Sequence, residues 1–376
     1  MNHDRETVVL RKSRQFDFGE PSKNVADYRS APLSLPRPDL FLRRKAPTPS
    51  PVFATYWRFA KIRQDTYFKR LFDPGNLTLS EDPILQRHRF TNVYRASDRV
   101  SQYLIRRVLF DRVWSPTDLA FRLLIFKFFN KIETWEAIER TIGDINWESY
   151  DFRQYASCLS GIMDSGKTIY SAAYIMASGS SIFGYERKHQ NHLKVIEMIM
   201  ADQFPDRVAQ LKSLESVYRL LRKYPCIGPF VGYQFAIDIN YSCLVNFSEN
   251  EFVEPGPGAL DGIAKCFSDP GDYSPTDIIR YMTDVQEEAF NEFAPDFSNL
   301  WGRPLHLIDC QNIFCEVDKY ARIAHPEIEG RSKRSRIKQI YRPLPQPMEK
   351  PWYPPEWHLN DRIASDSRLN VTKTKA

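Results

Sequence analysis

The sequence lacks the features that mark secreted, membrane-spanning and metal-bound proteins. It has no N-terminal apolar signal core and no run of about 18 apolar residues, so we expect an intracellular protein with no membrane partner. None of its six cysteines forms a C-x-x-C pair, and no histidine flanks them at the spacing of a zinc site. Four closely spaced cysteines for an iron–sulfur loop are also missing. We therefore expect unpaired thiols and predict no metal ligands.

Glycine and strand-like alternation are scarce, which favours an all-α fold. The chain has 15 Gly in 376 residues, and 14% of its residues are aromatic, enough to fill a large interior. Helical spacing of apolar residues predicts helices over 54–72, 95–110, 116–143 (as a pair), 149–165, 182–202, 206–222, 230–240, 258–267, 275–293 and 305–323.

The two ends differ from this helical region in composition. Residues 1–52 read as a basic, Pro-rich disordered arm, and residues 326–376 as a tail that is basic first and Pro-rich afterwards. The tail is expected to be extended and poorly packed. Residues 53–325 remain as one helical domain. The net charge of +5 is compatible with nucleic acid but weak evidence for it.

The stretch Gly161–Thr168, "GIMDSGKT", matches the phosphate-loop pattern G-x-x-x-x-G-K-[ST]. A phosphate loop follows a buried strand, so that its backbone N–H groups point at the phosphates. Here the preceding residues carry an apolar face at helical spacing, which predicts a helix that contains Gly161 and ends at Gly166. We therefore favour a helix end over a nucleotide site.

A second stretch, "YPCIGPFVGYQFAIDIN", is typical of a helix-hairpin-helix. Pro225–Gly228 fits the turn, and Gly228 would let backbone N–H groups of the second helix approach a DNA phosphate. The alternative is an ordinary pair of antiparallel helices with no ligand. The segment alone does not decide between them.

Several long blocks resemble the alpha-glutamyl/putrescinyl-thymine pyrophosphorylase family of DNA base-hypermodification proteins. The same region is described as the helical domain of 5-hydroxymethyldeoxyuridine DNA kinase. The blocks are "RFTNVYRASDRVSQYLI", "FRLLIFKFFNKIETW", "TIYSAAYIM", "YPCIGPFVGYQFAIDINYS", "EFVEPGPGALDGIAKCF" and "PLHLIDCQNIFCEVDKYAR", which together span about residues 55–325.

The resemblance implies a DNA-glycosylase-like helical fold used for a different reaction. In that reaction a hydroxymethyl group on uracil in DNA, activated as a pyrophosphate ester, is attacked by an amine that displaces the pyrophosphate. The implied partners are DNA, with a flipped or single-stranded base, and an amino acid or polyamine. No cofactor is identified, and a divalent metal on the pyrophosphate stays open.

Two blocks supply catalytic candidates for such a displacement, which needs cations on the leaving group and a base for the amine. In the first block, Arg95 and Arg99 are expected on one helix face, with Asn92 one turn earlier and Asp98 beside them; the alternative is a surface ion-pair stripe. In the second block, four polar residues fall on one helix face: Asp309, Asn312, Glu316 and Lys319. That row would deprotonate the amine, hold a metal pyrophosphate, or be a solvated face.

Candidates for binding the base or the DNA come from the hairpin and its neighbours. Aromatic walls are expected from Tyr94, Phe230, Tyr233 and Tyr241, with core packing as the alternative for each. The other candidates are polar side chains and turn residues: Asn92, Gly228, Pro229, Gln234, Asp238, Asn240, Gly256 and Gly258. Pro229-Phe230 and the Pro-Gly run after Glu254 depart from the base-excising enzymes of similar fold, which argues against ordinary base excision.

Four hypotheses remain open at this point. The first is a transferase on a modified thymine or uracil base, in which Asp309 and Glu316 meet Arg95 beside Gly228. The others are a non-catalytic DNA-binding module, a kinase that uses "GIMDSGKT", and a glycosylase that uses Glu254. The segment "KRSRIK" (333–338) reads as a solvated linker, a phosphate-binding arm or a nuclear localisation patch.

Overall fold

The structure, a computed structural model, describes residues 44–76, 80–343 and 347–369. The predicted N-terminal arm lies almost wholly outside these residues. The described residues divide into two compact units. Unit 1 comprises those of Met1–Val93 and Pro255–Met348, and unit 2 those of Tyr94–Glu254 and Glu349–Ala376. The sequence predicts a single helical domain over 53–325.

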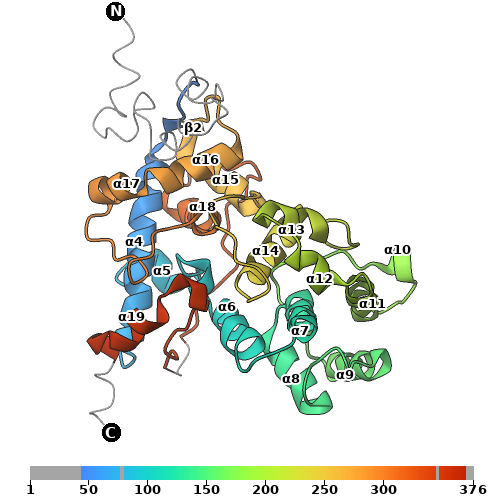
Figure 1. Ribbon diagram of the computed structural model, residues 1–376. Coiled ribbons are helices and arrows are strands. Elements are labelled where there is room, and N and C mark those ends of the chain that lie inside the picture. Colours follow the sequence, from blue (N-terminus) through green and yellow to red (C-terminus); the bar gives the residue numbers. More distant parts are fainter. Residues whose placement is uncertain (1–43, 77–79, 344–346, 370–376) are drawn as a thin grey trace, which may run out of the picture. The chain divides into compact units, whose positions relative to one another are not determined.

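Unit 1 is helical apart from one short antiparallel strand pair. Its elements are β1 (Thr48–Pro49), α4 (Pro51–Phe72), α5 (Pro83–Arg87), α15 (Pro257–Cys266), β2 (Phe267–Asp269), α16 (Pro275–Asp284), α17 (Gln286–Phe293) and α18 (Leu307–Ala324). The long helix α4 packs beside α18, α15 and α17 (Figure 1). Ser50 caps α4 by accepting from the Val52 N–H, and Pro51 occupies the first turn, where its missing N–H has no cost.

Helices α15 and α18 cross at very short range because α15 carries glycines at the contact. A Cβ built on Gly262 would lie 2.1 Å from the carbonyl oxygen of Phe314, and one on Gly258 would lie 3.1 Å from the Cys315 sulfur. A side chain at Gly262 would therefore force the two helices apart. This crossing fixes the position of α18, which carries the predicted row of polar residues.

In the described part of unit 2, all regular elements are helices. Its elements are η2 (Arg95–Ser97), α6 (Arg99–Tyr103), η3 (Leu104–Leu109), α7 (Pro116–Phe129), α8 (Ile132–Ile142), α9 (Phe152–Asp164), α10 (Ser180–Phe183), α11 (Lys188–Ala201), α12 (Phe204–Ala209), α13 (Leu214–Leu221), α14 (Pro229–Asn240), η4 (Pro355–Trp357), α19 (Asn360–Ser365) and η5 (Ser367–Leu369). Helix α7 is buried on nearly all sides and contacts α11, α12 and α14 (Figure 1). The all-α prediction is confirmed.

Several predicted helices are broken at identifiable residues. The segment 275–293 forms two helices that meet at Val285, and 206–222 forms α12 and α13 with Ser213 capping the second. The 95–110 segment changes from 3₁₀ to α to π-helical hydrogen bonding. Apolar spacing predicts that these regions are helical, but it does not detect short breaks or changes in the type of helix.

The tail packs far better than the sequence suggested. Tyr353 is fully buried, and its hydroxyl lies 2.7 Å from Ser97 Oγ. The Gln102 side chain donates to the Trp352 carbonyl at 3.1 Å and accepts from the Trp352 N–H at 3.0 Å. Large aromatic side chains bury much apolar surface per residue, so they anchor a Pro-rich segment that lacks helical periodicity. The expectation of a poorly packed appendage was wrong for these residues.

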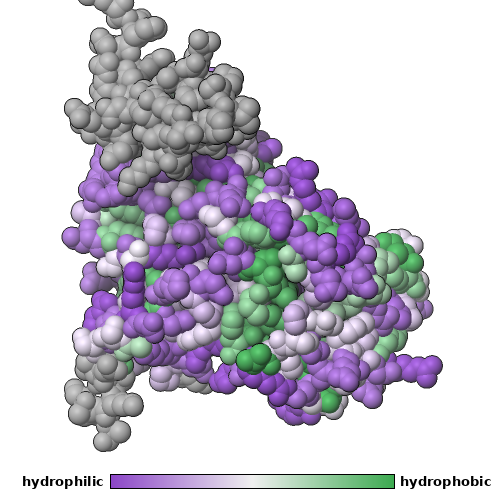
Figure 2. Space-filling model, viewed as in Figure 1, coloured by the Kyte–Doolittle hydropathy of each residue, from purple (hydrophilic) through white to green (hydrophobic). Residues whose placement is uncertain are grey.

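Hydrophilic residues dominate the face displayed in Figure 2. In the described part of the chain, no helix has the length and apolar character needed to cross a membrane.

Candidate functional site

The phosphate-loop pattern lies in a helix, as predicted. Helix α9 runs through Gly161 to Asp164, and Gly166 follows it with φ +78°, the left-handed conformation typical of a residue just after a helix. The backbone N–H groups of this stretch mostly bond within the helix end. A kinase site at "GIMDSGKT" is therefore ruled out by the helix that occupies it.

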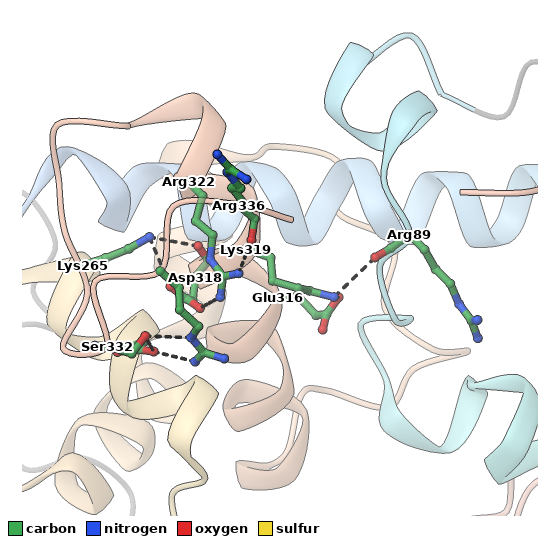
Figure 3. Close-up of polar contacts among 10 residues, drawn as sticks. Arg89, Lys265, Glu316, Asp318, Lys319, Arg322, Ser332 and Arg336 are labelled. Atoms are coloured by element: carbon green, nitrogen blue, oxygen red, sulfur yellow. Dashed lines mark hydrogen bonds and ion pairs between the residues drawn. The ribbon is translucent and has the colours of Figure 1, made fainter. Parts of the chain in front are cut away.

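The four predicted residues share helix α18 of unit 1. Glu316 Oε2 accepts from the Thr91 N–H at 2.9 Å and pairs with Lys319 Nζ at 2.6 Å. Asn312 Nδ2 donates to the Asn92 carbonyl at 2.7 Å. Lys319 Nζ donates to the Arg89 carbonyl at 3.3 Å, as Figure 3 shows. The row thus holds the backbone of residues 89–93.

Asp309 lies at the start of the same helix. Its carboxylate accepts from the His306 N–H at 3.1 Å, which is the reciprocal half of a capping box. Asn92, another predicted residue, accepts through its side-chain oxygen from Arg63 at 2.5 Å. Asn312 also accepts from the Thr91 hydroxyl at 3.2 Å, and the Lys319 ammonium lies 5.0 Å from the centre of the Phe90 ring. Their catalytic role stays a prediction.

Arg95 and Arg99 do not share a helix face, so that expectation was wrong. Arg95 lies in the 3₁₀ turn η2, Asp98 is extended with ψ 147°, and α6 begins only at Arg99. Arg99 is exposed and lies 3.6 Å from Glu133, whereas Arg95 is buried. An extended residue between two helical segments rotates the second away from the first, which separates the two arginines.

Buried Arg95 instead belongs to a charge cluster in unit 2. Its guanidinium forms a two-point contact with Asp238 on α14, at 2.8 Å and 3.0 Å. Lys127 of α7 reaches the second oxygen of the same carboxylate at 2.7 Å. Relative exposures are 4% for Arg95, 3% for Lys127 and 0% for Asp238. We call Arg95, Lys127 and Asp238 the unit 2 cluster.

The unit 2 cluster carries two cations for one carboxylate. Burial by itself raises the pKa of Asp238, but Arg95 and Lys127 hold that pKa below its ordinary value. Burial lowers the pKa of Lys127, and the charge of Arg95 lowers it further, against the attraction of Asp238. A buried charge is expensive unless it is paired, and here both cations pair with the one carboxylate of Asp238.

Aromatic side chains cover this cluster. The Lys127 ammonium lies 4.7 Å from the ring centre of Tyr174, and that ring lies 5.7 Å from the ring of Phe230 at an interplanar angle of 30°. Both aromatic residues are half-buried. The Tyr174 hydroxyl lies 3.4 Å from Gln234 Oε1, which also accepts from Arg95 Nε at 2.8 Å.

The cover is formed by the first turn of α14 and by an irregular segment. Gly228 is the N-cap of α14 and Pro229 its first residue, so the N–H groups of the first turn are free of intrahelical partners. Tyr174 adopts φ +57°, a conformation that costs a residue with a side chain about 1–3 kcal/mol. Non-glycine backbone strain of this kind is often retained where it positions a functional side chain.

The remaining predicted residues have structural contacts. Tyr94, Tyr233 and Tyr241 are buried, which favours core packing for them, and the Tyr241 ring lies 5.5 Å from the Arg95 guanidinium. The Asn240 side chain binds the backbone of Phe247: its Nδ2 donates to the Phe247 carbonyl at 2.9 Å, and its Oδ1 accepts from the Phe247 N–H at 2.8 Å. Gly256 caps α15.

Two residues of the candidate site were missed at the sequence level. Lys127 is the one lysine inside the apolar run "LAFRLLIFKFF", and a lone lysine in such a run signals a buried partner. Tyr174 lies in the block "TIYSAAYIM" that carries part of the family resemblance, but its contact with Lys127 depends on tertiary structure. The predicted meeting of Asp309 and Glu316 with Arg95 involves both units and stays a prediction. Among the described residues, no three His, Cys, Asp or Glu side chains form a group suited to a metal ion.

Comparison with known proteins identifies the family of the chain. Residues 50–330 match the family model described as "5-hmdU DNA kinase, helical domain". The chain is 25% identical over 307 residues to the "5-hmdU DNA kinase" of Bacillus phage SP10, covering 77% of this chain and 48% of that protein. It therefore spans about half the length of this curated relative. No solved structure matches the chain. The chain belongs to the 5-hmdU DNA kinase helical-domain family.

Proposed function

We propose that this protein modifies a 5-hydroxymethyluracil-type base in DNA, and that the base binds at the aromatic cover of the unit 2 cluster. The family and the phage relative support DNA carrying 5-hmdU as the substrate class. The observation that carries the site is the pair of buried cations, Arg95 and Lys127, which share one carboxylate beneath Tyr174 and Phe230.

The reaction that suits this arrangement is displacement of pyrophosphate by an amine. The amine nitrogen forms a bond to the methylene carbon on C5 of the base, and the bond from that carbon to the pyrophosphate oxygen breaks. Pyrophosphate leaves with the bonding electrons, and the ammonium that forms gives its extra proton to water. Negative charge therefore develops on the leaving oxygen, where buried cations stabilise it most.

Each residue then has a role in this proposal. Tyr174 and Phe230 stack a base that has left the helix, and Lys127 and Arg95 face the leaving group. Asp238, which its two cations keep ionised, acts as a counter-ion. Gln234, bonded to Arg95, is placed for hydrogen bonding to the base edge. The cover has to shift for a base to enter, and the irregular segment at Tyr174 is the element to move.

Two observations favour a second function, in which the chain binds the modified base without performing phosphoryl transfer. One is the helix that occupies "GIMDSGKT", and the other is that the chain matches only about half of the phage relative. The phage protein is about twice as long as the matched region, and the matching model is described as a helical domain. In this alternative the chain selects and presents 5-hmdU, and phosphoryl transfer is performed elsewhere.

Mass spectrometry of digested DNA distinguishes amine transfer from the presenting role. DNA carrying pyrophosphorylated hydroxymethyluracil is incubated with the protein and a mixture of amino acids and polyamines, then digested to nucleosides. The proposal expects an amine-adducted nucleoside that disappears with Lys127→Met and persists with Arg140→Ala, a variant at an exposed position of α8. Preferential binding of 5-hmdU DNA with no adduct would support the presenting role instead.

A further inference from the structure

The basic segment between Gly330 and Lys338 is fixed to the surface of unit 1. Asp261 of α15 accepts hydrogen bonds from the Ser332 N–H at 2.7 Å and from Ser332 Oγ at 2.5 Å. The same carboxylate pairs with Arg334 at 2.7 Å, although Arg334 is itself half-exposed. The Asp261 carboxylate has lost its hydrogen bonds to water, and these three donors replace them. Hydrogen bonds to a buried charge are strong, so this contact holds the segment firmly.

Two further contacts continue the anchoring along the segment. Arg322 of α18 donates to the Arg336 carbonyl at 2.8 Å, and its guanidinium also pairs with Asp318, which is in turn bound by Lys265 (Figure 3). Beyond Lys338, Gln339–Tyr341 runs antiparallel to Arg87–Arg89, with the Arg89 N–H and Tyr341 N–H each donating across at 3.0 Å. The segment is therefore held at its start, middle and end.

The anchored backbone displays a row of unpaired cations. The exposed basic residues are Arg331, Lys333, Arg336 and Lys338 on the segment, with Arg87 and Arg89 on the paired strand. None of these six side chains forms an ion pair with another residue in the described part of the chain. The contacts with Asp261 and Asp318 hold these cations near one another, where they repel. Binding of an external anion would relieve this repulsion.

We propose that this row, which we call the basic strip, binds the phosphate backbone of the DNA outside the base site. The inference rests on the proposed function for the identity of the polymer. An extended row of cations suits a polyanion with regularly spaced charges. Between Arg331 and Lys338 the one apolar residue is Ile337, which is half-buried, and Ile340 just beyond is a single exposed apolar side chain. One such side chain is too little apolar surface for stable insertion into a lipid bilayer, which favours a polyanion over a membrane.

Equilibrium binding to two duplexes tests the strip. The duplexes differ only in carrying thymine or 5-hydroxymethyluracil at one position, and affinity is measured at salt concentrations from about 50 to about 200 mM. The triple variant Lys333→Ala, Arg336→Ala, Lys338→Ala is compared with Arg140→Ala, Arg153→Ala, Lys167→Ala, which removes the same charge from exposed, unpaired positions of unit 2.

The strip variant should bind both duplexes more weakly by the same factor. Its salt dependence should fall by about 0.9 in logarithmic slope for each phosphate that the strip no longer neutralises, while the preference for the modified base is unchanged. Affinity and slope equal to those of the control variant would overturn the strip. Strip-dependent binding to phosphatidylserine vesicles without strip-dependent DNA binding would also overturn it. Failure of the proposed function shows separately, as equal affinity of the wild type for the two duplexes.

The variant Asp261→Asn tests the anchoring itself. It leaves every cation of the strip in place and frees Arg334, so the total positive charge rises. If the anchored backbone matters, trypsin should cleave after Arg331 and Lys333 faster, and DNA affinity should fall severalfold despite the extra charge. Faster cleavage with unchanged or tighter DNA binding would show that the arrangement of the strip is irrelevant.

Discussion

Both units bury one aspartate between two cations, but the surroundings of the two aspartates differ. In unit 1, Asp318 pairs with Lys265 and Arg322, and these cations also donate to the backbone carbonyls of Asp318 and Arg336. In unit 2, Lys127 also contacts Asn130 at 2.9 Å and lies over the rings of Tyr174 and Phe235.

The contrast shows that charge composition alone does not identify a site. The cations of unit 1 complete their hydrogen bonds on backbone oxygens and fix the chain. In unit 2, Arg95 also donates to the Gln234 carbonyl at 3.4 Å, but Lys127 lies against the half-buried ring of Tyr174, which neighbours Phe230 in the first turn of α14. In the proposed function, the ligand meets these cations there. We therefore interpret the first arrangement as a structural anchor and propose the second as the binding site.

The largest expected effect comes from removing either aspartate. Asp238→Asn and Asp318→Asn each leave two buried cations without a carboxylate, which should lower the free energy of unfolding by about 3–5 kcal/mol. Urea unfolding followed by circular dichroism measures it. A decrease below about 1 kcal/mol for either variant would mean that its cluster is more hydrated than the burial of its members implies.

The lysine variants should then separate the two clusters. Lys127→Met leaves the two-point pair of Arg95 and Asp238 intact and removes a surplus buried cation, so the change in unfolding free energy should be within about 1 kcal/mol. Lys265→Met also removes a hydrogen bond to the Asp318 carbonyl, and should cost about 1–3 kcal/mol. Equal decreases in parallel urea titrations would contradict the distinction between anchor and site.

Replacing the aromatic cover should affect function more than stability. Tyr174→Ala removes a cation–π contact of about 0.5–2 kcal/mol. It keeps the left-handed backbone, so the net decrease in stability should be about 1 kcal/mol. Binding titrations should show that the variant loses its preference for 5-hydroxymethyluracil over thymine. A retained preference would remove Tyr174 from the base site.

The smallest effect is a pH dependence of stability. The pKa of Lys127 is lowered in the folded protein, so between that pKa and the ordinary lysine value the unfolded chain binds more protons. The contribution of Lys127 to stability should therefore rise with pH through this window. Subtracting the urea stability curve of Lys127→Met from that of the wild type isolates it. A difference curve that falls with pH would mean that the pKa of Lys127 is raised instead.

The sequence predicted the parts of the molecule that depend on local pattern. The helical face of Asp309, Asn312, Glu316 and Lys319, and the helix that occupies "GIMDSGKT", follow from apolar spacing. The error at Arg95 and Arg99 arose from one extended residue, Asp98, which periodicity does not detect. The pairing of Lys127 with Asp238 joins residues far apart in the chain, and no local rule places them together.

The most direct test compares base preference in three proteins. Affinity for duplexes carrying 5-hydroxymethyluracil or thymine is measured for the wild type, Lys127→Met and Lys265→Met at one salt concentration. We expect a clear preference for the modified base in the wild type and in Lys265→Met, and none in Lys127→Met. A preference that survives in folded Lys127→Met would contradict the assignment of the unit 2 cluster as the base site.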